Sequence, residues 1–192
     1  VMIGGWLIDR EAANDTVKNL LTVPVSLSRL LGAKLIVTAI LAVLFGLYSV
    51  GVTVLTGVIA GLPGLAAGTL LGCGLQLVWA ALTTYLVCMP MILIFGQIRG
   101  AYLGGAILTF FLGYSMLFFK SGVLLSAYPF SAALILAGFD MEEYNGATAQ
   151  PSLPLAAAGM IFVILITVLI LKMSRPGKQK KPAPKKKTGR RK

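Results

Sequence analysis

The chain has 192 residues, of which 57% are hydrophobic and only 12% are charged. Soluble domains carry about 25% charged residues, so the composition excludes an ordinary soluble enzyme and predicts an all-α integral membrane protein. The net charge of +11 comes from residues 172–192, which hold eleven of the 17 lysines and arginines, so the rest of the chain is neutral and offers no basic face for DNA.

The first predicted element is residues 1–8, an apolar run that is too short for a membrane crossing of about 20 helical residues. It also lacks the basic flank of a signal peptide. We therefore expect it to be the end of a transmembrane helix whose beginning lies upstream, so that the chain is N-terminally incomplete.

Residues 9–34 follow as a polar segment with seven of the twelve charges that lie outside the tail. Helical spacing of three apolar residues predicts a short amphipathic helix that ends at Pro24. Its apolar residues are Val17, Leu20 and Leu21, and its N-cap is Asn14 or Asp15. The periodicity leaves open whether this helix lies on lipid or docks on a partner. Ser26 can cap a second helix that runs through Arg29 and Lys34 into the membrane.

Residues 35–98 contain no charged residue, and their length suits two crossings with a turn at residues 61–64. Pro90 predicts a kink late in the second of these. The four predicted crossings of the chain are residues 35–59, 66–95, 101–119 and 155–171.

Residues 121–139 are apolar but interrupted by two serines and Pro129. Lysine and arginine collect on the cytoplasmic side, so residues 9–34 and the tail should both lie inside, and a fifth crossing would place the tail outside. We therefore expect residues 121–139 to be a re-entrant or interfacial pair of short helices on the outer face, with residues 140–152 as an outer loop. The tail, 172–192, is predicted to be a disordered cytoplasmic segment that touches anionic lipid.

Few residues of the chain could catalyse a reaction or bind a metal or ATP. Histidine is absent, Cys73 and Cys88 lie apart within apolar spans, and no GxxxxGK[ST] phosphate loop occurs. The chain is therefore expected to bind no metal or ATP and to catalyse no reaction. The predicted spans hold no Asp, Glu, Lys or Arg, which disfavours a carrier driven by protons or sodium ions, so that energy would come from another subunit.

Three polar residues share one face of the second crossing: Gln76, Thr83 and Thr84. Two interpretations stay open, which are hydrogen bonds between helices and the lining of a substrate path. Glycines spaced by four also predict close helix approach, at Gly68 with Gly72 and at Gly100 with Gly104.

The polar segment carries a more specific pattern. The charged residues Asp9–Glu11 close an apolar helix, and Asp-Thr-Val-Lys-Asn-Leu-Leu-Thr-Val-Pro-Val-Ser follows at residues 15–26, with Arg29 and Lys34 after it. This resembles the first cytoplasmic loop of type-2 ABC exporter permeases, and most of all the bacitracin- and lantibiotic-type permeases. The resemblance implies six transmembrane helices per permease, of which this chain would hold the end of the second and the four that follow, with short re-entrant helices before the sixth.

The resemblance also implies a function. The loop would form a coupling helix that docks on a separate ATPase subunit, which would bind ATP and Mg²⁺. The implied coupling residues are Asp15, Thr16, Val17, Lys18, Leu20, Leu21 and Pro24, and the implied charged loop ends are Asp9, Arg10, Glu11, Arg29 and Lys34. We therefore expect a plasma-membrane permease that works with a second permease copy or homologue and exports or removes an amphiphilic substrate such as a peptide antibiotic. The alternative is a non-transporting membrane immunity or scaffold subunit.

Overall fold

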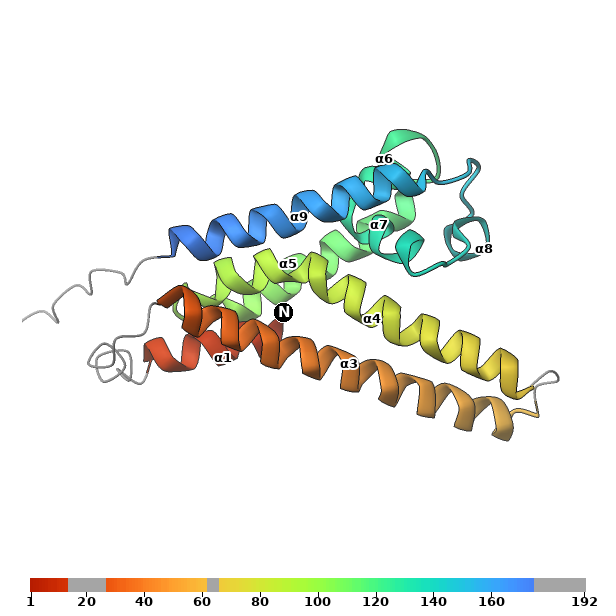
Figure 1. Cartoon of the computed structure of the whole chain (residues 1–192), viewed down its shortest axis with the longest axis horizontal. Coiled ribbons are helices and arrows are strands. Elements are labelled where there is room, and N and C mark those ends of the chain that lie inside the picture. Colours follow the sequence, from red (N-terminus) through yellow and green to blue (C-terminus); the bar gives the residue numbers. More distant parts are fainter. Residues whose placement is uncertain (14–26, 62–65, 175–192) are drawn as a thin grey trace, which may run out of the picture.

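The computed structural model describes residues 1–13, 27–61 and 66–174, and within these ranges the chain forms helices and no strand (Figure 1). The elements are α1 (Met2–Ala13), α3 (Leu27–Ile59), α4 (Ala67–Gly96), α5 (Tyr102–Ser115), the 3₁₀ turn η1 (Met116–Phe118), α6 (Gly122–Ala127), α7 (Pro129–Leu136), α8 (Met141–Asn145) and α9 (Leu153–Met173). The prediction of an all-α polytopic membrane protein is confirmed.

Three of the described helices, α3, α4 and α9, are long and apolar enough to cross a membrane. Between 17% and 33% of the residues in their most apolar windows are buried within the chain. The other side chains of these windows lie on the surface of the bundle. Such apolar surfaces suit contact with lipid or with further helices rather than with water.

The helix at the predicted third crossing is shorter than these three. α5 and η1 together form an apolar helix over Tyr102–Phe118, which ends where the backbone becomes extended at Phe119, just before Lys120. At about 1.5 Å per residue in α5 and about 2 Å in η1, this helix covers roughly 27 Å. The helix is therefore slightly shorter than a hydrocarbon core of about 30 Å.

α4 lies at the centre of the bundle, where it contacts α1, α3, α5, α7 and α9. Glycines lie where neighbouring helices come closest to α4. A Cβ atom on Gly46 of α3 would lie 3.0 Å from the Cα of Val78, and one on Gly96 of α4 would lie 2.9 Å from the Cβ of Ile8 in α1. These helices therefore pack backbone against side chain with no room for a methyl group.

Within the described part of the chain, the two predicted glycine pairs do not have this role, and their approach to other helices stays a prediction. A Cβ atom would meet no neighbouring atom within 4 Å at Gly68, Gly72, Gly100 or Gly104. Gly100 instead has a φ of +71°, a conformation that favours glycine and that lies in the turn between α4 and α5.

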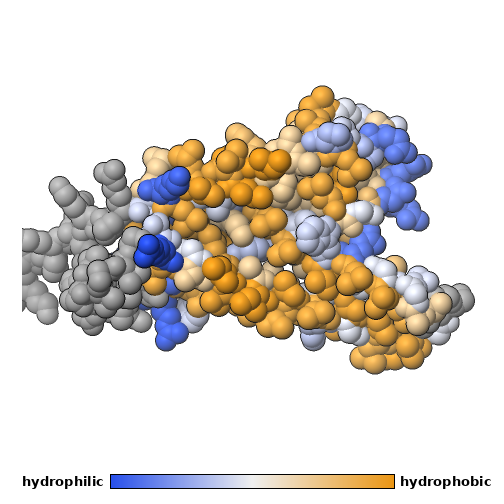
Figure 2. Space-filling view, in the orientation of Figure 1, coloured by the Kyte–Doolittle hydropathy of each residue, from blue (hydrophilic) through white to orange (hydrophobic). Residues whose placement is uncertain are grey.

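Charged residues gather at the two ends of the described bundle, with apolar side chains over the surface between them (Figure 2). We call one end the loop end, because α1 finishes and α3 begins there. It carries Asp9, Arg10, Glu11, Arg29, Lys34, Arg99 and Lys172. We call the opposite end the far end, where α6, α7 and α8 lie. It carries Lys120, Asp140, Glu142 and Glu143.

The short helices α6 and α7 occupy the segment 121–139. They have 6 and 8 residues, and the chain breaks between them because Pro129 begins α7 and the preceding residue is extended. At about 1.5 Å per residue they cover roughly 9 and 12 Å, so neither is long enough to cross a membrane. Both pack on α9, and α7 also packs on α4. The position of this segment relative to the membrane stays a prediction.

Candidate functional site

The predicted coupling residues lie outside the described part of the chain. They are Asp15, Thr16, Val17, Lys18, Leu20, Leu21 and Pro24, and the predicted caps Asn14, Asp15 and Ser26 lie there with them. The structure describes the two flanks of this segment, which are the end of α1 and the first turns of α3. How these flanks are held decides how a force on the segment would enter the bundle.

Asp9 ties the first flank to the turn between α4 and α5. Its Oδ1 accepts a hydrogen bond of 3.1 Å from the backbone N–H of Gly100. Next to it, the guanidinium of Arg10 lies 5.1 Å from the ring centroid of Trp6, one turn earlier in α1, which is a cation–π distance. Glu11 follows in the same helix. The end of α1 is thus fixed to the α4–α5 turn rather than only to its own helix.

Lys34 ties the second flank to the first. Its Nζ donates a hydrogen bond to the backbone carbonyl of Leu7 in α1. Arg29, in the first turn of α3, is exposed. Of the predicted charged loop ends whose side chains are described, the structure therefore brings Asp9 and Lys34 against other helices and places Arg10 and Arg29 on the surface.

A buried hydroxyl pair fixes α3 to α4 one turn beyond Lys34. The Tyr85 hydroxyl donates to the carbonyl of Leu35 and lies 2.9 Å from the Oγ1 of Thr38. Both hydroxyl-bearing residues are only 7% exposed. Tyr85 also belongs to a buried hydrophobic cluster that we call the loop-end core, which consists of Ile8, Leu31, Leu35, Tyr85, Ile92 and Leu93. Sequence reasoning gave Tyr85 no role, because a tyrosine in an apolar helix is equally typical of simple packing.

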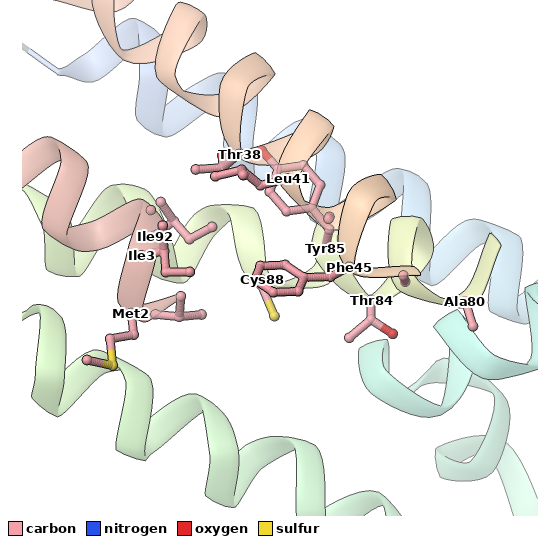
Figure 3. Close-up of a pocket in the computed structure, with 14 residues that line it drawn as sticks. Met2, Ile3, Thr38, Leu41, Phe45, Ala80, Thr84, Tyr85, Cys88 and Ile92 are labelled. Carbon is pink, nitrogen blue, oxygen red and sulfur yellow. Dashed lines mark hydrogen bonds between the residues drawn. The ribbon is translucent and has the colours of Figure 1, made fainter. Parts of the chain in front are cut away.

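A first cavity of about 500 Å³ lies between α1, α3 and α4, beside this hydroxyl pair (Figure 3). Its walls are mostly apolar. Thr84 and Cys88, one turn apart on α4, point into it, with Met2 of α1 across the gap. A group bound in this cavity would meet hydrocarbon side chains and few hydrogen-bond partners.

A second cavity of about 410 Å³ lies between α4, α5, α7 and α8. Four aromatic residues line it: Phe110, Tyr114, Phe130 and Tyr144. Thr84 borders this cavity as well as the first, so the two adjoin at that residue. Together they follow one side of α4 from the level of α1 toward the far end.

Gln76 and Thr83 do not line either cavity. Gln76 donates from Nε2 to the carbonyl of Gly138 at 2.7 Å, and the Thr83 hydroxyl lies 3.0 Å from the carbonyl of Ala133. Their polar groups thus serve contacts with the segment around α7. Of the three residues on the predicted face, the structure leaves only Thr84 at a cavity wall.

Sequence reasoning also missed a third donor on this face. Trp79 donates from Nε1 to the carbonyl of Leu136 at 3.1 Å. Its signal was present in the sequence, because Trp79 lies three residues after Gln76 and four before Thr83 on one helical stripe. An indole on an apolar helix is read first as packing, however, and only the position of α7 shows which carbonyl it serves.

The contacts converge on α4. It is bonded to the start of α3, its end packs on α1, one side of it borders both cavities, and another holds α7. A displacement of the loop flanks can therefore reach the cavity walls through packed and hydrogen-bonded contacts alone.

A family model described as ABC-2 family transporter protein matches residues 1–116, which is more than half of the chain and includes the predicted coupling segment and both of its flanks. No curated protein matches the chain, and no solved structure matches it.

Proposed function

The chain belongs to the ABC-2 family of transporter proteins, and from this premise we propose that it is the permease of an ATP-driven exporter whose ATPase docks on residues 15–24. Membership itself makes the chain a multi-pass membrane permease subunit of an ABC transporter, a component that is not catalytic. The family implies an ATPase partner. The exporter direction, the docking residues and the substrate below are our proposal.

The attachment of the loop flanks is the observation that carries this proposal. Asp9 and Lys34 bind the two ends of the segment to the α4–α5 turn and to α1, while Tyr85 joins α3 to α4. A partner that pushes on the segment would therefore move α4 and the two cavities beside it. ATP and Mg²⁺ would bind to the partner subunit. This chain would contribute the segment on which the partner pushes and the cavities through which the substrate would pass.

The charge distribution supports a cytoplasmic loop end. Five of the seven charged residues described there are basic, whereas three of the four at the far end are acidic. Lysine and arginine are retained on the cytoplasmic side of membrane proteins. In this orientation the segment that would meet the ATPase and the basic tail both lie inside the cell, at the plasma membrane.

The cavities support an amphiphilic substrate. Thr84 places a hydroxyl group in a mostly apolar wall. Tyr114 and Tyr144 add hydroxyl groups to the aromatic lining of the second cavity. Such a surface suits the apolar part of a molecule whose polar part stays in water. A peptide antibiotic is the class that the bacitracin- and lantibiotic-like loop favours, and a second permease copy or homologue would complete the path.

The docking assignment is tested by Leu20→Asp, with Leu20→Met as the matched control. The aspartate would place a charge on the apolar stripe that we assign to the ATPase contact, whereas methionine keeps the stripe apolar. We expect Leu20→Asp to abolish copurification of the partner ATPase and Leu20→Met to retain it, with equal membrane insertion of both. Full-strength copurification with Leu20→Asp would refute the assignment. A stable complex whose ATP hydrolysis never responds to any amphiphile would favour the scaffold alternative.

A further inference from the structure

α7 is a short helix that forms one wall of the second cavity. It has 8 residues, and its side chains Phe130 and Leu134 make one wall of that cavity. The opposite walls come from α4 and α5. The two ends of α7 are held by these same two helices, so what fixes α7 also fixes the width of the cavity.

The beginning of α7 is bonded to α5. The hydroxyl of Tyr128, the residue before Pro129, donates to the carbonyl of Leu112 at 2.6 Å and lies 2.8 Å from the Oγ of Ser115. The Tyr128 ring also meets Phe119 edge to face, with 4.9 Å between centroids. This end is anchored both by hydrogen bonds and by aromatic packing.

The other end of α7 is bonded to α4. A helix leaves its last carbonyls without partners inside the helix, and in apolar surroundings they need donors from elsewhere. Trp79 donates to one of them, the carbonyl of Leu136. Gln76 donates to the carbonyl of Gly138, just beyond the helix, and the Thr83 hydroxyl lies 3.0 Å from the carbonyl of Ala133, which also accepts from the backbone N–H of Ala137. We call Gln76, Trp79 and Thr83 the α4 latch. Gly138, with a φ of +79°, ends the helix in the conformation that favours glycine.

The latch and the cavity wall are neighbours in sequence. Thr83 holds α7 and is 3% exposed, while Thr84, the next residue, borders both cavities. A movement of α4 that changes the cavity at Thr84 therefore also acts on the bond at Thr83. Because the latch consists of a few hydrogen bonds and no covalent link, it can release once water supplies the freed carbonyls with new partners.

We propose that α7 is a gate over the second cavity, held closed at its α4 end by the α4 latch and pivoting on its Tyr128 end when the latch releases. The gate itself follows from the contacts of α4, α5 and α7. Its use as the exit for an exported amphiphile rests on the proposed function.

The test measures how often the cavity opens. A single cysteine is placed at Gly113, where a Cβ would lie 3.6 Å from the Phe130 ring, in ordinary contact, after Cys73 and Cys88 are replaced by alanine. The whole permease is placed in lipid nanodiscs, so that both faces are accessible, and the rate of reaction with a water-soluble maleimide is followed without ATP. The latch variants are Gln76→Leu and Trp79→Phe. Each removes the donor, the first by substituting an apolar side chain of similar size and the second by substituting a smaller aromatic ring.

Each latch variant should react roughly three- to tenfold faster than the parent, which corresponds to the loss of one hydrogen bond. Combining the two should roughly multiply the increases. Thr167→Val is the matched control, because this residue is also 3% exposed but its hydroxyl bonds to Val163 within α9. It should leave the rate within twofold of the parent, and all variants should elute as the parent does on gel filtration.

The gate is refuted if both latch variants react at the parental rate, or if Thr167→Val accelerates the reaction as much as they do. The measurement needs neither the ATPase nor a substrate. Faster labelling of latch variants in a permease that never copurifies an ATPase would support the gate and refute the proposed function. Unchanged labelling in a permease that does form the complex would refute the gate alone.

Discussion

Tyr85 joins α3 to α4 through one hydroxyl, which makes its contribution separable from that of its ring. Tyr85→Phe keeps the ring in the loop-end core but leaves the carbonyl of Leu35 without this donor and Thr38 without this partner. We expect a loss of about 1–2 kcal/mol, because hydrogen bonds in apolar surroundings are costly to leave unmade. In thermal unfolding of the purified permease this corresponds to roughly 2–8 °C.

Tyr48→Phe is the control for this prediction. Tyr48 is 70% exposed on α3, so removing its hydroxyl should change the melting temperature by less than about 2 °C. Equal melting temperatures for the two variants would show that the buried hydroxyl pair does not hold α3 to α4.

The residues of the α4 stripe show what a sequence can predict at this scale. Its period correctly places Gln76 and Thr83 on one face, because helical spacing fixes which side chains share a side. It leaves open what they face, since the same polar residues suit a substrate path and a helix contact. The bonds to Gly138 and Ala133 show the helix contact, and they join residues about 50 to 60 positions apart that no local pattern connects.

At the scale of helices, glycines separate faces that pack from faces that do not. A Cβ atom on Gly96 would lie 2.9 Å from the Cβ of Ile8, an atom that cannot move without the backbone of α1. Gly104 of α5 has nothing within 4 Å. We expect Gly96→Ala to lower the free energy of unfolding by about 1–3 kcal/mol through overpacking. Gly104→Ala should be neutral or stabilising by up to about 1 kcal/mol, since alanine restricts the unfolded chain.

Thermal unfolding of the two alanine variants in the same detergent measures this difference. A destabilisation by Gly104→Ala as large as that by Gly96→Ala would contradict the packing described for α5. It would also indicate that the Gly104 face meets another helix outside the described bundle.

Long apolar elements are predicted well from the sequence, and short ones poorly, for a physical reason. α3, α4 and α9 follow from uncharged runs, because length and hydropathy alone decide whether a helix can span a membrane. The end of α5 at Phe119 and the placement of α7 depend on contacts such as those of Tyr128 and Trp79. Helix ends in apolar surroundings are set by where donors for their last carbonyls lie, which is a property of the packed molecule.

At the scale of the whole molecule, the charges and the helix lengths favour the same arrangement. α3, α4, α5 and α9 run between the loop end and the far end, so an even number of passes returns the chain to the loop end (Figure 1). α6 and α7 begin and finish at the far end, and their lengths of roughly 9 and 12 Å suit a segment that dips into one face. Basic residues dominate one end and acidic residues the other, which is the distribution expected if the loop end is cytoplasmic.

This arrangement predicts which positions an impermeant thiol reagent reaches in intact cells. Single cysteines at Ser121 and Glu143, both exposed, bracket the segment of α6 and α7, and one at Lys172 marks the loop end. In a background without Cys73 and Cys88, we expect Ser121→Cys and Glu143→Cys to react from outside and Lys172→Cys to react only after permeabilisation. If Ser121→Cys and Glu143→Cys react from opposite faces, the segment crosses the membrane and the gate cannot be a far-end element. If all three react from outside, the loop end is not cytoplasmic, and residues 15–24 could not meet an ATPase that consumes cytoplasmic ATP.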